Sequence, residues 1–218
     1  SYTGGVGAVY VYKRTESNWA QEAYIKPANN SSDGTSPAGM YYGSSLSLQN
    51  DTLVVGASRE KSNQTSITND ATASSDTSLN YAGAVYVYKR SGTNWSQEAY
   101  IKPDNLDAND YFGHSVSIFN ARLVVGAVGE ASNYAYALHY SSSDNSYPDA
   151  GAAYIFVRSG TTWSLQQYLK ANNVGAGDKF GLSVSTTNGS YGASYKNKVI
   201  AVGAPYEDSD GVGDNNNL

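Results

Sequence analysis

The chain has 218 residues, a net charge of −5 and 14 Lys and Arg residues that are scattered along it. This balance excludes a nucleic-acid interface, because no basic cluster is present to neutralise a run of phosphates. Cysteine is absent, which excludes disulfides and thiolate chemistry, and no apolar run approaches the roughly 20 residues of a membrane span.

The first predicted element is a hairpin that occurs three times. A run of the Tyr-Val-Tyr type, a short polar turn and a run led by tryptophan lie at 7–27, 83–103 and 151–170. In the second copy, alternation from Ala84 to Lys89 places valines on one face and tyrosines on the other. The short turn that follows predicts pairing with residues 95–101. The three copies are marked by Trp19, Trp95 and Trp163.

A second hairpin accompanies each copy. It combines an aromatic-Gly run with an apolar run that contains Val-Gly-Ala, at 42–48 with 53–57, 111–118 with 122–127, and 180–185 with 199–205. We expect these glycines where φ is positive or where strands approach closely. The motif residues are Tyr42, Gly43, Gly56, Phe112, Gly113, Gly126, Phe180, Gly181 and Gly203. Polar loops of different length, 58–82 and 128–150, connect the repeats on one rim. Together with the abundance of Tyr and Gly, the pattern predicts an all-β fold.

This order of motifs resembles the FG-GAP repeat, the blade unit of integrin α-subunit propellers and of many bacterial secreted proteins. The bacterial form is the closer one, as seen in residues 158–163, 175–181 and 201–209. The resemblance implies a β-propeller-type fold of four-stranded antiparallel blades. It extends over 1–218 as a single domain, with repeats at about 7–82, 83–150 and 151–218.

Three repeats are fewer than the typically 4 to 8 blades of a closed propeller. The first hairpin is of the Tyr-Val-Tyr type and the last of the Val-Gly-Ala type, so these two are complementary halves of one blade. We therefore expect an incomplete propeller or arc, completed by a longer parent chain or by another copy of this chain. A head-to-tail contact between copies that does not close would give a filament.

Catalytic motifs are missing from the sequence. It has no His-Glu-x-x-His and no phosphate-binding glycine loop, and residues 113–117 lack the second glycine of a nucleophile elbow. His114 is expected in a strand and His139 in a loop. The turn at 91–95 is similar to the Asp box of propeller sialidases, but Arg90 stands where the aspartate is required. We expect no enzymatic activity.

Two acidic clusters are candidates for calcium, which prefers several oxygen ligands. They are Asp104, Asp107 and Asp110, and Glu207, Asp208, Asp210 and Asp214. Neither matches the twelve-residue calcium loop, and solvated turns are the alternative. Integrin-type calcium loops between the aromatic-Gly and Val-Gly-Ala runs cannot be carried over, because this sequence lacks their Asp-rich stretch.

Six sequons are candidates for N-glycosylation, with chance occurrence as the alternative in a chain rich in Asn, Ser and Thr. They begin at Asn29, Asn30, Asn50, Asn63, Asn94 and Asn188. The leading hypothesis is an extracellular or cell-surface, non-enzymatic structural or adhesive module that self-associates or continues in a larger chain. The alternative is a lectin-like or calcium-dependent adhesion domain that binds glycans or a cell-surface protein.

Overall fold

The computed structural model describes residues 5–30, 39–135, 137–138, 142–188 and 198–208. All regular secondary structure in these ranges is β-strand, which confirms the all-β prediction. The strands are β1 (Val9–Thr15), β2 (Asn18–Ile25), β3 (Tyr42–Gln49), β4 (Thr52–Ala57), β5 (Ala84–Ser91), β6 (Asn94–Ile101), β7 (Phe112–Phe119), β8 (Arg122–Ala127), β9 (Ala137–Leu138), β10 (Ala152–Ser159), β11 (Thr162–Leu169), β12 (Ser183–Asn188) and β13 (Lys198–Gly203).

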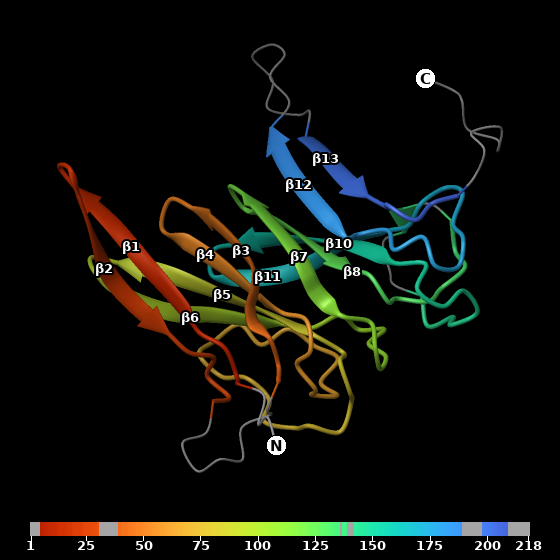
Figure 1. The fold of residues 1–218 in the computed structure, drawn as a ribbon, viewed down its shortest axis with the longest axis horizontal. Helices are drawn as coiled ribbons and strands as arrows, with labels where there is room; N and C mark the ends of the chain where they lie inside the picture. Colours follow the sequence, from red (N-terminus) through yellow and green to blue (C-terminus); the bar gives the residue numbers. More distant parts are fainter. Residues whose placement is uncertain (1–4, 31–38, 136, 139–141, 189–197, 209–218) are drawn as a thin grey trace.

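The strands form two complete blades and two half-blades (Figure 1). Blade A has the order β3-β4-β5-β6, and blade B has the order β7-β8-β10-β11 with the short β9 added at its outer edge. The head hairpin, β1–β2, and the tail hairpin, β12–β13, are separate two-stranded sheets. All pairings within these sheets are antiparallel. The predicted four-stranded antiparallel blades are thus confirmed. The short strand β9 was not predicted, because it lies in the segment 128–150 that was expected to be a polar loop.

Each blade has a valine face and an aromatic face, as the period of two in the sequence predicts. The valine face of blade A, including Val85 and Ile101, packs on the aromatic face of blade B, including Tyr154 and Trp163. The valine face of the head hairpin packs in the same way on the aromatic face of blade A. The core is therefore a series of blade-to-blade layers and not one central cluster.

Glycines allow the inner strands to approach. Gly113 and Gly181 have φ of 85° and 92°, a region that a residue with Cβ rarely adopts. A Cβ on Gly126 would lie 2.0 Å from the carbonyl oxygen of Gly181 on the next unit. The predicted roles of the motif glycines, positive φ and close approach, are confirmed at these positions.

The arc is open. In Figure 1 the head hairpin and the tail hairpin lie at opposite ends of the series of blades. Within the described residues, β1 pairs only with β2, and β13 pairs only with β12. The predicted incomplete propeller is therefore what the structure contains. The predicted run 180–185 begins as a strand only at Ser183, where the ladder with Gly203 of β13 starts, and Phe180 forms a parallel bridge to Gly151 as Phe112 does to Gly83.

Candidate functional site

The aromatic face of blade B shows how a covered face is built. Tyr154 packs on Phe112 and Tyr168 with ring centroids 5.3 and 5.2 Å apart, and Trp163 is 1% exposed beneath the valine face of blade A. Edge-to-face pairs of this kind add about 0.5–1.5 kcal/mol to the burial itself. The repeated Tyr and Trp residues thus form packing between blades here.

A charged clamp crosses each of the two interfaces between successive units. Glu98 on blade A accepts hydrogen bonds from Arg158 Nε at 2.6 Å and from Trp163 Nε1 at 2.9 Å, both on blade B. Arg158 Nη2 donates to the second carboxylate oxygen, so the guanidinium is held at two points. The same clamp joins the head hairpin to blade A through Glu22, Arg90 and Trp95. The Arg90 hydrogen bond is the main reason why the pKa of Glu22 is lowered.

A second repeated contact lies inside each complete blade. Lys102, which follows β6, donates to Glu60, which follows β4, at 2.7 Å with both side chains fully buried. Burial lowers the pKa of Lys102, while the Glu60 carboxylate opposes that shift. Ser62 bonds to Glu60 and lies 2.7 Å from the hydroxyl of Tyr100. Blade B repeats the arrangement with Lys170, Glu130, Ser132 and Tyr168. This ion pair connects the inner and outer hairpins of one blade.

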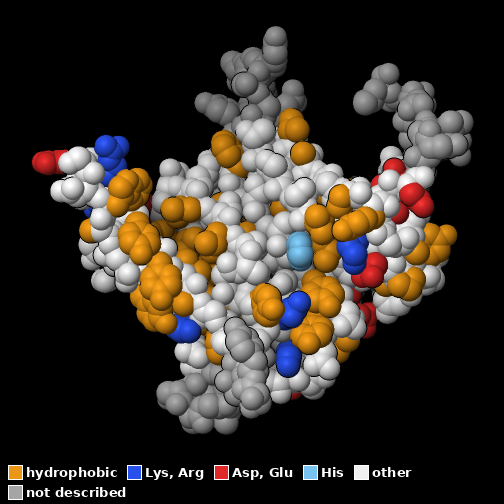
Figure 2. Space-filling model, in the orientation of Figure 1, with side chains coloured by type: hydrophobic (Ala, Val, Ile, Leu, Met, Phe, Trp, Pro, Cys, Tyr) orange, Lys and Arg blue, Asp and Glu red, His pale blue; other side chains and the backbone are white. Residues whose placement is uncertain are grey.

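The head end exposes large side chains that are covered elsewhere. Tyr10, Tyr12 and Tyr24 are 54%, 55% and 52% exposed, whereas their equivalents in blade B are at most 1% exposed. Trp19 is 68% exposed against 1% for Trp163. On β3, Leu46 and Leu48 are likewise more than half exposed, although Val116 and Ile118 at the same places of blade B are buried. We call Tyr10, Tyr12, Trp19, Tyr24, Leu46 and Leu48 the head surface. Figure 2 shows hydrophobic side chains along the edge where β1 and β2 lie.

The tail end carries the opposite halves of the repeated contacts. Ser115 donates to the carbonyl of Gly181 on the next unit at 2.7 Å, and Ser45 donates to Gly113 at 2.8 Å. Ser183 holds the equivalent place on β12, where it is exposed. Leu169 on β11 is half-buried, whereas Ile101 at the same place of blade A is fully covered. We call Gln166, Leu169, Ser183, Val199, Ala201 and Gly203 the tail surface.

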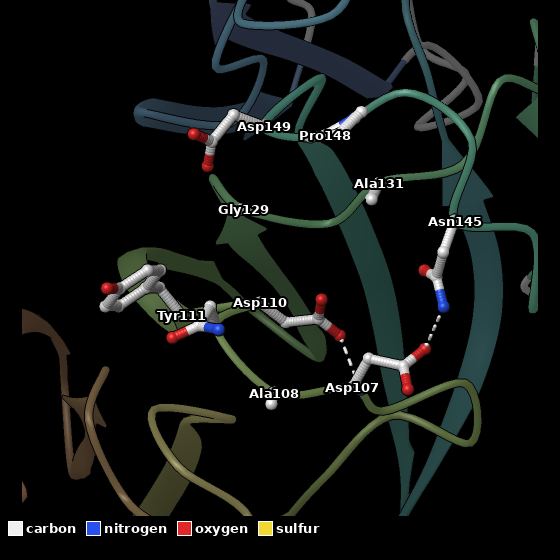
Figure 3. Close-up of a pocket in the computed structure, with 10 residues that line it drawn as sticks. Asp107, Ala108, Asp110, Tyr111, Gly129, Ala131, Asn145, Pro148 and Asp149 are labelled. Atoms are coloured by element: carbon white, nitrogen blue, oxygen red, sulfur yellow. Dashed lines mark hydrogen bonds between the residues drawn. The ribbon is translucent and has the colours of Figure 1, made fainter.

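The first acidic cluster forms a turn. Asp110 is 3% exposed and accepts a hydrogen bond from the backbone nitrogen of Asp107 at 2.8 Å, and burial raises the pKa of Asp110 to about 8. Asp107 itself accepts from Asn145 at 2.8 Å, and both residues line a cavity of about 590 Å³ (Figure 3). Asp104 is exposed. Asp178 makes the same turn contact with Gly175, so this geometry favours the turn interpretation.

The second acidic cluster lies partly outside the described residues. Glu207 is half-buried and Asp208 exposed, while Asp210 and Asp214 lie outside the described part. Across the described ranges, no group of three or more His, Cys, Asp or Glu side chains is placed to hold a metal ion. His114 lies on β7 as expected, and His139 also lies outside the described residues.

The sequons differ in accessibility. Asn29 is 6% exposed. Its amide nitrogen donates to the carbonyl of Ser74 at 2.7 Å, and its amide oxygen accepts from the hydroxyl of Tyr86 at 2.9 Å. This packing argues against a glycan at Asn29 in the folded chain. Asn30 is half-buried. Asn188 ends β12, and its side chain is outside the described part. The exposed positions are Asn50, Asn63 and Asn94.

Open, four-stranded antiparallel blades with glycine-mediated approach define a propeller-type repeat protein. Residues 95–156, from β6 to most of β10, match the sequence model of the FG-GAP repeat. The resemblance is thereby confirmed over these residues, and this repeat indicates a propeller-like, adhesion-type module. None of the curated proteins matches the chain. Over the described residues, no helix is long and apolar enough to cross a membrane.

The motifs and the alternation of the strands did not reveal the acidic residues of the repeated contacts. Glu22 and Glu98 stand three residues after the tryptophan of their copies, and Glu60 and Glu130 stand three residues after Val-Gly-Ala. Alignment of the three repeats would have found both positions. The same alignment reveals one exception, Gln166, at the place of the clamp glutamate.

Proposed function

We propose that this chain is an extracellular, non-enzymatic structural or adhesive module whose copies join head to tail by completing the split blade. The tail hairpin of one copy and the head hairpin of the next then form one four-stranded blade. The single observation that carries the proposal is the exposure of the head surface, since every equivalent side chain in blade B is at most 9% exposed.

The pairing within blade A supplies the register of the joined blade. There β4 pairs with β5 through six residues, among them Val55 opposite Tyr86 and Thr52 opposite Lys89. The equivalent residues place Val202 of one copy opposite Tyr10 of the next, as the alignment of the repeats dictates. The joined blade thereby gains the β4–β5 type of ladder, which neither hairpin has alone.

The charges of the two ends are complementary as well. Lys26 stands at the place of Lys102 and Lys170, and Glu207 stands at the place of Glu60 and Glu130. In the described chain Lys26 donates to the carbonyl of Gly7 at 2.7 Å. Joining two copies brings Lys26 to Glu207 of the neighbour, which reproduces the ion pair that connects inner and outer hairpins in the complete blades.

The free energy available from burial of the head surface is appropriate for a concentration-dependent contact between copies. Four half-exposed aromatic side chains of roughly 150–250 Å² each offer about 400 Å² for burial, or about 10 kcal/mol at 25 cal/mol per Å². Association costs an estimated 4–15 kcal/mol in lost freedom. The strand ladder and the ion pair therefore decide the balance, and both require the stated register.

Light scattering across a concentration series, with negative-stain electron microscopy, tests the proposal. We expect species larger than one chain, and loss of these species in Tyr12→Ser and Leu48→Ser. Tyr134→Ser is the matched control, because Tyr134 is 52% exposed but lies outside the head surface. A chain that stays monomeric at every concentration, or an equal effect of Tyr134→Ser, would overturn the proposal.

The extracellular location rests on the FG-GAP repeat and on the exposed sequons. Its test is the intact mass of native material before and after enzymatic removal of N-glycans. A loss of mass that maps to Asn50, Asn63 or Asn94 supports the location. A mass equal to that of the bare polypeptide in both samples counts against glycosylation.

A second candidate function, binding of acidic carbohydrate, is favoured by a cavity of about 500 Å³ whose lining includes Tyr41, Arg59, Tyr111 and Lys179. The Arg59 guanidinium lies 4.1 Å from the centre of the Tyr41 ring, and Tyr41 and Tyr111 both have positive φ, 56° and 54°. Figure 2 shows hydrophobic and basic side chains gathered around a histidine on this face. Aromatic faces stack on sugar rings, and basic groups attract carboxylates.

Thermal melting with oligogalacturonate tests this candidate, with a neutral glucan as the control. A ligand that binds the native state must raise the melting temperature, and Arg59→Ala should abolish the rise. Calcium and EDTA in the same assay test the calcium-dependent alternative. No shift with any of these ligands would remove the ligand-binding function.

A further inference from the structure

The clamp that joins successive units has a different composition at the junction between copies. At both interfaces within the chain the acceptor is a glutamate, Glu22 or Glu98, whose side chain is 6% or 8% exposed. At the third place, on β11 of blade B, the residue is Gln166, and it is exposed. The donors that would meet it, Arg14 and Trp19, are exposed on the head hairpin.

We propose that Gln166 sets the strength of the junction between copies, making it weaker than the interfaces within a chain. This inference rests on the proposed head-to-tail function and names the residue that tunes it. The blade-completing contacts then determine where copies join, and Gln166 determines how tightly they do so.

The chemistry of the acceptor explains the difference. A glutamate presents two oxygens, and Glu22 uses both, since Arg90 Nε and Nη2 donate to different oxygens while Trp95 Nε1 shares one of them at 3.1 Å. A glutamine presents one acceptor oxygen and an amide nitrogen that can only donate. Arginine at the junction therefore gains at most one arm of the fork, and loses the charge-assisted character of the bond.

Gln166 also has a competing partner within its own chain. Its oxygen accepts a hydrogen bond from Arg122 Nη2 at 3.2 Å. Blade A has Thr52, which carries no charge, at the place of Arg122. Arg14 of a joining copy must share or displace this contact, which weakens the junction further.

The position of Gln166 on the backbone is suited to the role. In blade A the pairing shifts between Val87 and Tyr88, which leaves Glu98 as the extra residue of a β-bulge. In blade B the shift between Ile155 and Phe156 leaves Gln166 in the same position. Bulges direct a side chain out of the regular alternation, here toward the next unit, so exchange of Gln166 for Glu needs no change of backbone.

Gln166→Glu is therefore a gain-of-function test in the full chain. Sedimentation velocity over a concentration series should show self-association roughly five- to tenfold tighter than wild type, from the difference between neutral and charged hydrogen bonds. The gain should disappear when Arg14→Gln is added, and should shrink at high salt. Ser91→Glu is the control for net charge, because Ser91 is the exposed last residue of β5 in blade A.

The outcomes separate this inference from the proposed function. Wild-type association that Gln166→Glu leaves unchanged or weakens overturns the role of Gln166 while the head-to-tail function stands. Monomers in both the wild type and Gln166→Glu overturn the head-to-tail function together with the inference. A gain that persists in Arg14→Gln overturns the assignment of Arg14 as the partner.

Discussion

Equivalent lysines in a complete blade and in a half-blade should behave differently when they are replaced by methionine. Lys102 is fully buried against Glu60 at 2.7 Å, so Lys102→Met leaves an uncompensated carboxylate inside blade A. Breaking a buried pair in this way costs about 3–5 kcal/mol. Lys26→Met removes a hydrogen bond to Gly7, which is worth about 0.5–1.5 kcal/mol.

Urea unfolding of dilute, monomeric protein measures the two losses. A second variant, Lys102→Met with Glu60→Gln, controls for the buried charge and should recover much of the stability, since both members of the ion pair are then neutral. Lys26→Met should weaken association of the copies by at least about tenfold, which is 1.4 kcal/mol, because the ion pair proposed between Lys26 and Glu207 of the neighbour is then lost.

Equal destabilisation of the monomer by Lys26→Met and by Lys102→Met would refute this prediction. In that case Lys26 already has the structural role that the joined blade is meant to give it. Self-association that Lys26→Met leaves unchanged would also contradict it, because the complementary charges of the two ends would then contribute nothing to the free energy of association.

Three further predictions concern single positions. Burial raises the pKa of Asp110 to about 8, above its unfolded value near 3.9. Between these two values the folded state holds a proton that the unfolded state releases. The free energy of unfolding should therefore fall as the pH rises from about 4 to 8. Asp110→Asn, which keeps the oxygen that accepts from Asp107, should remove most of that fall in urea unfolding; an identical pH dependence in both proteins would refute it. Gly126→Ala should lower the melting temperature by several degrees or prevent folding, because its Cβ would lie 2.0 Å from the Gly181 carbonyl oxygen. Gly92→Ala is the comparison, because its Cβ would have open space around it although φ is 64°. It should lower the melting temperature less. Trp19 is 68% exposed and Trp163 is 1% exposed, so iodide should quench Trp19 in the monomer and not in the assembled protein; equal quenching in Trp19→Phe and wild-type monomer would contradict this.

The strands and blades could be predicted from the sequence because the repeats state the same pattern several times. The valine and tyrosine alternation at 84–89 predicts the two faces that Val85 and Tyr86 occupy. The complementary half-blades follow from the order of the motifs alone. These properties depend on local periodicity, which a sequence records directly.

The clamp could not be predicted from alternation, because Glu98 is the extra residue of a bulge. Strict alternation assigns the bulge residue, and every residue after it in the strand, to the wrong face of the sheet. The burial of Asp110 could not be predicted from the sequence either, since a turn with three aspartates is equally consistent with a calcium site. Burial is the main cause of its raised pKa, and the smaller charge effects include those of Glu130 and Lys170, which come from distant segments of the chain.

Disulfide trapping tests the central claim most directly, because the chain has no cysteine of its own. Lys89 and Thr52 pair across blade A with their side chains 2.8 Å apart, and the equivalent residues across the junction are Lys13 and Val199, both exposed. We expect the double variant Lys13→Cys with Val199→Cys to form covalent multimers on oxidation, and Lys13→Cys with Lys198→Cys, one residue out of register, to form far fewer. Monomers alone after oxidation, or equal yields from both variants, would contradict blade completion between copies.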